Sequence, residues 1–252
     1  MATVILVRHG RTTANTSGVL AGRSRGVLLD DLGRSQAQRA GERLGVLPLA
    51  TVVSSPLERC RDTAKAIVAH QGDGLTIARE RGIVEVDYGA WTGQGLKDLA
   101  KDPLWQTVQH HPAGVTFPDG ESMAAMASRA VATVRRWDSA VTQEHGPDAV
   151  WVAVSHGDVI KAVLADALGM HLDVFQRIVV DPASVSVVRY APGRPFVLTM
   201  NSYEGDLSFL RPQPRKKSTR RGGRSRASAG DAAACYVSVA TPVSGSTIAP
   251  HI

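Results

Sequence analysis

Short apolar runs and longer segments with helical spacing alternate along the first 200 residues. The runs are rich in β-branched residues and bounded by polar or turn-forming residues, which is typical of buried strands. Strands are predicted over residues 3–7, 51–53, 149–154, 184–190 and 196–200. The last two are joined through Pro192-Gly193, which predicts a hairpin.

Between these runs, apolar residues recur every three or four positions, as on one face of a helix. Helices are predicted over residues 33–47, 57–69, 120–145 and 159–168. For the last of these we expect Asp158 to act as the N-terminal cap and Gly169 to end the helix. The segment 86–120 has weak periodicity and several Gly and Pro residues, so we expect it to form a cover over a site.

The alternation of strands and helices predicts an α/β fold, with three layers (α/β/α) and a largely parallel central sheet. After Leu210 the composition changes to Pro, Arg, Lys, Ser and Gly, and then to Ala, Ser and Thr. We therefore expect one domain over residues 1–210, followed by a basic, disordered tail over 211–252.

The basic charge of the chain lies in this tail. Residues 211–226 hold eight of the 29 Lys and Arg residues, whereas residues 1–210 contain 21 basic and 22 acidic residues. The predicted domain is therefore nearly neutral, which argues against a nucleic-acid-binding fold. The basic run contains no aromatic residue, so we expect at most weak binding of polyanions and no specific nucleic-acid recognition.

Two cysteines are too few for a disulfide framework. Residues 1–7 carry no basic residue before their apolar run, and no stretch reaches the roughly 20 apolar residues of a membrane span. The sequence therefore predicts a cytoplasmic protein without a membrane segment.

Three of the predicted strands end directly in polar clusters. These are Arg8-His9-Gly10, the stretch from Ser54 to Arg59, and Ser155-His156-Gly157-Asp158. Because ligands of open α/β sheets bind outside the carboxyl ends of the strands, we expect the three clusters to meet in one crevice. Glu85, which stands before a Gly-rich stretch, is the fourth candidate.

Two histidines, two arginines and one carboxylate suit phosphoryl transfer. Guanidinium groups bind phosphate oxygens through paired hydrogen bonds and keep their charge. A neutral imidazole can attack phosphorus and later leave, and a carboxylic acid can protonate the departing oxygen and then activate water.

These motifs together resemble the histidine phosphatase superfamily, which includes the cofactor-dependent phosphoglycerate mutases. The resemblance covers about residues 3–200, with the motifs in the family's order. It rests on Arg8-His9-Gly10 after an N-terminal strand, the string SSPLERCRDTA at 54–64, Glu85 with Tyr88-Gly89, and Ser155-His156-Gly157.

The resemblance implies a role for each matching residue. His9 would be the nucleophile and Glu85 the general acid, while His156 would also stabilise the transferring charge. The phosphoryl group would be held by Arg8, Asn15, Arg59 and His156. The family needs no metal or other cofactor for this step, its substrates are small phosphorylated metabolites, and homodimers are common in it.

The family contains both phosphatases and mutases. Its glycolytic mutases carry Arg-His after the acid, where this chain has Val86-Asp87, and they use further arginines for a second acidic group. A carboxylate at Asp87 would repel such a group if it faced the pocket. The sequence thus favours a phosphomonoester hydrolase acting through phosphohistidine. A phosphomutase that acts on a sugar or glycerate phosphate is the alternative. A catalytically inactive anion-binding protein is the third hypothesis.

Several neighbouring residues allow two interpretations. Asp87 competes with Glu85 for the acid's role, although a turn-forming aspartate is favoured. Arg11 and Arg23 reach either the substrate or only water. Cys60 lies beside Arg59, but we expect it to point away from it on a helix and to serve in packing.

Overall fold

The computed structural model describes residues 2–203. The predicted tail over 211–252, and the predicted domain boundary at 210, lie outside the described residues. Both therefore stay predictions.

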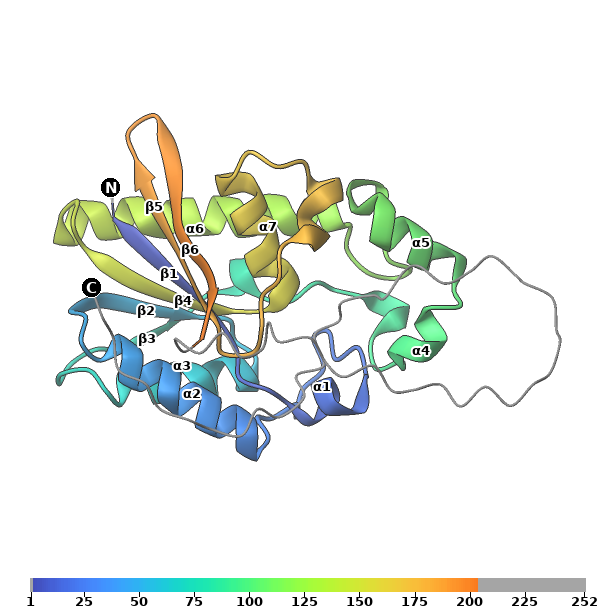
Figure 1. The fold of residues 1–252 in the computed structure, drawn as a ribbon, viewed down its shortest axis with the longest axis horizontal. Helices are drawn as coiled ribbons and strands as arrows, with labels where there is room; N and C mark the ends of the chain where they lie inside the picture. The colour runs from blue at the N-terminus through green and yellow to red at the C-terminus, as the bar shows by residue number, and fades with distance from the viewer. Residues whose placement is uncertain (1, 204–252) are drawn as a thin grey trace, which may run out of the picture. The chain divides into compact units, whose positions relative to one another are not determined.

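A six-stranded sheet in the order β3-β2-β4-β1-β5-β6 runs through the centre of this region. Strands β3, β2, β4 and β1 are parallel, whereas β5 and β6 form an antiparallel hairpin at one edge (Figure 1). The strands span Thr3–Arg8 (β1), Leu49–Ser54 (β2), Ile77–Arg79 (β3), Val150–Ser155 (β4), Val185–Ala191 (β5) and Arg194–Ser202 (β6). The largely parallel sheet is as predicted, except that β3, with three residues, was not foreseen.

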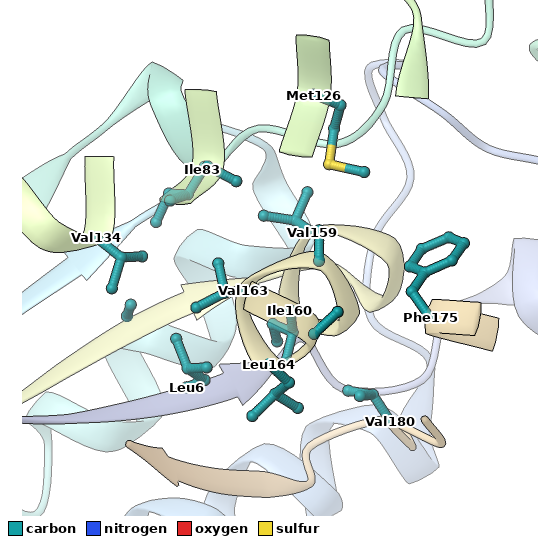
Figure 2. Close-up of a cluster of buried hydrophobic side chains, with 14 of the residues drawn as sticks. Leu6, Ile83, Met126, Val134, Val159, Ile160, Val163, Leu164, Phe175 and Val180 are labelled. Carbon is teal, nitrogen blue, oxygen red and sulfur yellow. The ribbon is translucent and has the colours of Figure 1, made fainter. Parts of the chain in front are cut away.

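Helices cover both faces of the sheet and give the predicted three layers. On one side lie α2 (Asp31–Leu44) and α3 (Glu58–Val68), and on the other α6 (Met123–His145) and α7 (Gly157–Ala167) (Figure 1). Two hydrophobic cores lie on opposite faces of the sheet, and alternate side chains of β1 belong to one or the other. Ile5 and Val7 pack with α2 and α3, whereas Leu6 packs in the second cluster with residues of α6 and α7 (Figure 2).

The start of α7 differs from the prediction. His156, with extended φ and ψ angles, is the N-cap residue, and Asp158 lies inside the first turn. Asp158 instead accepts a hydrogen bond of 2.7 Å from the Tyr88 hydroxyl. The C-terminal prediction holds, because Gly169 follows the helix at φ +67°.

The segment 86–120 contains short helices that its weak periodicity did not predict. These are α4 (Leu96–Leu99), α5 (Pro103–His110) and the 3-10 turns η2 (Gly89–Trp91) and η3 (Pro112–Gly114). Backbone hydrogen bonds tie this segment to the residues after α1 (Thr13–Ser17), with Gly93 N–H donating to Leu20 O at 2.7 Å. Through Tyr88 and Asp158 the segment also contacts the start of α7.

Two further 3-10 turns complete the elements: η1 (Arg81–Ile83) and η4 (Leu172–Arg177). Among residues 2–203, no helix combines the length and apolar character that crossing a membrane requires.

Candidate active site

The parallel register brings the three polar clusters together. Arg8 pairs with Ser155 across β1 and β4, so His9 and His156 each follow their strand at the same level. The His9 N–H donates to Ser155 O at 3.0 Å, and the two imidazole centroids lie 5.3 Å apart. The convergence expected from the strand ends is thus observed.

One nitrogen of the His9 imidazole is unprotonated and accepts a hydrogen bond from Arg59. Nδ1 lies 2.8 Å from Gly10 O; since a carbonyl can only accept, Nδ1 carries the proton and Nε2 keeps its lone pair. Arg59 Nε donates to this Nε2 at 3.2 Å. Burial, together with the charges of Arg59 and Arg8, holds the pKa of His9 well below its usual value, so the ring is neutral at pH 7.

Two guanidinium groups at the site, of Arg59 (buried) and Arg8 (partly buried), keep unpartnered donors on buried nitrogen atoms. Arg59, in the first turn of α3, is 2% exposed and donates through Nη2 to Gly22 O at 2.8 Å, but its Nη1 has no partner. Arg8 donates through Nη1 to Val180 O at 2.6 Å, and its Nε has no partner. An unsatisfied buried donor costs about 1–3 kcal/mol, and more when charged, so these atoms point to an anionic ligand.

His156 is fully buried and held on both sides of its ring. Its Nε2 lies 2.8 Å from Ser55 Oγ, and its Nδ1 lies 3.2 Å from Arg59 Nη2 and 3.7 Å from Glu85 Oε2. Burial, followed by the charges of Arg59 and His9, lowers its pKa well below the usual value. Ser55 belongs to the second motif, but no sequence pattern pairs it with His156, 101 positions away.

Cys60 is buried, as expected of a packing residue, but what it packs against was not foreseen. Its Sγ lies 3.4 Å from Nε2 of His156 and donates to Ser155 O. Burial raises the pKa of this thiol to about 12, so it stays protonated.

Glu85 has the properties of a carboxyl that is protonated near neutral pH. It is 9% exposed, and its Oε1 accepts from the N–H of Val86 at 3.0 Å. Burial and then the charge of Asp158 raise its pKa to about 7.

Asp87 adopts the turn-forming arrangement that the sequence favoured. Its Oδ1 accepts from Gly89 N–H at 3.2 Å, and its Oδ2 pairs with Arg23 Nη1 at 3.1 Å. Because this pairing offsets its charge, Asp87 would repel a second anionic group less than its sequence position suggested.

Asn15 serves a local structural purpose in α1. Its Oδ1 accepts from the N–H and the hydroxyl of Thr12, at 3.0 and 2.9 Å, in a capping box. A phosphate contact by Asn15 would therefore have to come from its amide nitrogen, and that contact stays a prediction.

The two arginines left open by the sequence both have partners in the protein. Arg11 Nε pairs with Asp30 at 2.8 Å. Arg23 contacts Asp87, Glu121 and the carbonyl of Glu85. Glu121 was not predicted as a partner, because it lies 98 positions from Arg23 and carries no local signal of this pairing.

Two other features of the described residues bear on ligand binding. Among residues 2–203, no group of three or more His, Cys, Asp or Glu side chains is arranged to hold a metal ion. A cavity of about 500 Å³ between α6 and α7 is lined by Ala127, Ala162, Arg135 and Asp166 among others. None of the predicted site residues lines it, so it is separate from the chemistry described above.

Comparison with known proteins gives a consistent picture. The family described as histidine phosphatase superfamily (branch 1) matches residues 4–203. Phosphoserine phosphatase 1 of Hydrogenobacter thermophilus is 32% identical over 206 residues, covering 80% of this chain and 92% of that protein. A probable phosphoglycerate mutase, GpmB of Yersinia pestis, is 28% identical over 192 residues, covering 75% of this chain and 86% of the mutase. Among solved structures, mycobacterial glucosyl-3-phosphoglycerate phosphatase with VO3 superposes with a TM-score of 0.72 at 27% identity, covering 79% of this chain and 98% of that one.

Proposed function

Because this chain belongs to branch 1 of the histidine phosphatase superfamily, we propose that it hydrolyses phosphomonoesters through a phosphohistidine formed on His9. One observation carries this proposal. A neutral His9, whose unprotonated Nε2 accepts from Arg59 Nε, stands beside two arginines whose buried Nε (Arg8) and Nη1 (Arg59) atoms lack partners. A phosphate group would satisfy these donors and place phosphorus next to the nucleophile.

In the first step, Nε2 of His9 attacks phosphorus while the bond from phosphorus to the ester oxygen breaks. Arg8 and Arg59 stabilise the charge on the other phosphate oxygens. Glu85, protonated because its pKa is raised to about 7, gives its proton to the departing oxygen. The products are an alcohol and the phosphorylated His9.

His156 contributes through Nδ1, the ring nitrogen near Arg59 and Glu85. To donate to a phosphate oxygen, Nδ1 must carry a proton, so in the neutral ring Nε2 must accept one. Arg59 Nη2, which can only donate, lies 3.2 Å from Nδ1, so this tautomer requires Arg59 to turn Nη2 to the phosphate; the Ser55 hydroxyl, 2.8 Å from Nε2, then donates to Nε2. Ser55 is therefore proposed to hold His156 in its donating tautomer.

In the second step, the Glu85 carboxylate takes a proton from water as the water oxygen attacks phosphorus. The bond between phosphorus and Nε2 breaks, which releases inorganic phosphate and restores neutral His9 and protonated Glu85. In both steps the positive charge comes from Arg8, Arg59 and the His156 N–H.

Hydrolysis is preferred over mutase activity because Val86-Asp87 after Glu85 supplies no cation for a second acidic group, and because Arg11 and Arg23 already pair with carboxylates. A mutase must bind the second acidic group of its substrate as well. The relatives named as phosphatases act, by those names, on phosphoserine and on glucosyl-3-phosphoglycerate, so we place the substrate among small phosphorylated metabolites. The likeness to the Yersinia mutase keeps phosphomutase as the second candidate.

The proposal also includes a cytoplasmic location, a homodimer and a tail over residues 211–252. It further includes the absence of specific nucleic-acid binding. The location is proposed from the low cysteine content, and the homodimer from the frequency of dimers in the family. The last two points are proposed from the confinement of basic charge to residues 211–226.

The proposal is tested by measuring phosphate release from a panel of phosphorylated metabolites, with and without 2,3-bisphosphoglycerate. Hydrolysis that does not depend on this primer is expected. Isomerisation that requires it would establish the mutase instead. Absence of turnover on every substrate would point to the anion-binding alternative.

A further inference from the structure

Arg23 lies in the loop between α1 and α2, and its guanidinium is directed at the segment that carries Glu85. Nε donates to the backbone carbonyl of Glu85 at 2.8 Å, Nη1 to Asp87 Oδ2 at 3.1 Å, and Nη2 to Glu121 Oε1 at 2.8 Å. All three nitrogens are thus used within the protein. Arg23 thus binds groups of the protein, while its side chain keeps 34% exposure to solvent.

Gly22, the residue before Arg23, contacts Arg59, the arginine proposed to bind phosphate. The carbonyl of Gly22 accepts from Arg59 Nη2 at 2.8 Å. Gly22 has φ +50°, and a Cβ atom there would come within 2.9 Å of Thr92 Oγ1 and 3.1 Å of Tyr88 Cδ2. The loop therefore lies tightly on the residues that follow Glu85, and two successive residues link Arg59 to Glu85.

A second arginine holds the same peptide from the other side. Arg129, in α6, donates through Nη2 to the Glu85 carbonyl at 3.1 Å and through Nη1 to the carbonyls of Gly82 and Val84. Both Arg23 and Arg129 bond to Glu121, Arg129 through two nitrogens. One carboxylate thus joins the two guanidinium groups that bind the backbone of Glu85.

The carboxyl of Glu85 depends on this backbone for its position. Oε1 is held by the N–H of Val86, which belongs to the same segment. A general acid must lie within hydrogen-bond reach of the departing oxygen. A displacement of about 1 Å is enough to cost roughly 100-fold in rate.

We propose that Arg23 is a positioning residue for the general acid: by binding the Glu85 carbonyl while Gly22 binds Arg59, it fixes the acid relative to the bound phosphate. The proposal rests on the proposed role of Glu85. Arg23 itself touches neither substrate nor the reacting atoms.

The test uses the full chain and the rate of enzyme phosphorylation in the burst phase, with glycerol phosphate and with para-nitrophenyl phosphate. Arg23→Ala should slow the step about 10- to 100-fold with glycerol phosphate, but about threefold or less with para-nitrophenyl phosphate, whose leaving group needs no proton. Arg23→Lys keeps the charge and should show the same asymmetry at a smaller size, which also covers the case that the alanine variant does not fold.

The matched control is Arg34→Ala. Arg34 also donates to a backbone carbonyl, that of Leu29 at 2.6 Å, and pairs with Asp31, but it does not contact Glu85. Its loss should leave both rates within about twofold of wild type, as for a surface substitution.

A double-mutant cycle separates positioning from general structural damage. In a Glu85→Gln background, Arg23→Ala should cause no further loss with glycerol phosphate, because the proton donor is already gone. Equal losses with both substrates, or a full additional loss in the Glu85→Gln background, would overturn the proposal. If Glu85→Gln alone shows no leaving-group dependence, the acid itself is misassigned and the proposal falls with it; a wild-type enzyme without a burst would instead refute the proposed function.

Discussion

The hydroxyl of Ser55 lies 2.8 Å from Nε2 of His156, while the other ring nitrogen, Nδ1, lies 3.2 Å from Arg59. Ser55 follows β2 and His156 follows β4, and the two strands are parallel neighbours. The hydrogen bond therefore results from strand register, which places a hydroxyl behind the imidazole while Nδ1 faces Arg59 and Glu85.

Replacing Ser55 with Ala should remove the group that holds the tautomer of His156. We expect phosphorylation of the enzyme to slow about 10-fold, the size of one hydrogen bond of roughly 1.4 kcal/mol. With inorganic phosphate bound, the ¹⁵N chemical shifts of His156 in this variant should move, relative to wild type, toward the tautomer with the proton on Nε2. Ser54→Ala is the control, since its hydroxyl donates to Ser55 O at 2.9 Å and not to His156. Unchanged shifts and an unchanged rate in Ser55→Ala would remove Ser55 from the mechanism.

The raised pKa of Glu85 predicts a direction for the pH dependence. The first step needs the protonated acid, so the burst rate with an alkyl phosphate should be highest at low pH and fall as the pH rises through about 7. The hydrolysis step needs the carboxylate and should show the opposite trend. In Glu85→Gln, the burst rate should no longer fall as the pH rises. If the fall persists in this variant, a group other than Glu85 causes it.

The leaving group distinguishes Glu85 from Asp87 as the acid. Glu85→Gln should slow phosphorylation by about 10²- to 10⁴-fold with sugar or glycerol phosphates, and much less with para-nitrophenyl phosphate. Asp87→Asn should not show this asymmetry, because Asp87 is bound to Gly89 N–H and Arg23. The reverse pattern would identify Asp87, and not Glu85, as the general acid. If neither variant showed it, the proton would come from another group, such as His156.

Activity should survive EDTA. Arg8, Arg59 and the His156 N–H supply the positive charge that a metal ion would bring to the transition state. Phosphate release is measured after dialysis against the chelator. Complete loss of activity that a divalent ion restores would establish a metal-dependent phosphatase and contradict the proposed mechanism.

The strand ends were predictable from the sequence because each apolar run stops directly at its polar cluster. Parallel pairing then brings His9, Ser55 and His156 to one edge without further information. The N-cap of α7 was predicted two residues late, since His156 is both the end of the strand region and the cap. The elements β3, α1 and α4 have three to five residues, too few for a periodic pattern to be recognised.

The network around Glu85 could not be predicted in the same way. Arg23, Glu121 and Arg129 come from two loops and a helix, and the separation of 98 positions between Arg23 and Glu121 leaves no local pattern. A charged residue on a helix or in a loop is usually solvated, so only the three-dimensional arrangement reveals that these charges hold one peptide carbonyl.

The central claim is that the phosphoryl group passes through His9, and brief incubation with a ³²P-labelled phosphomonoester followed by quenching tests it most directly. The account predicts a label on the wild-type protein that is lost in acid and stable in base, and that maps to the peptide containing His9. It also predicts no label on His9→Ala. Recovery of undiminished label on His9→Ala, or a wild-type label that is stable in acid, would contradict the account.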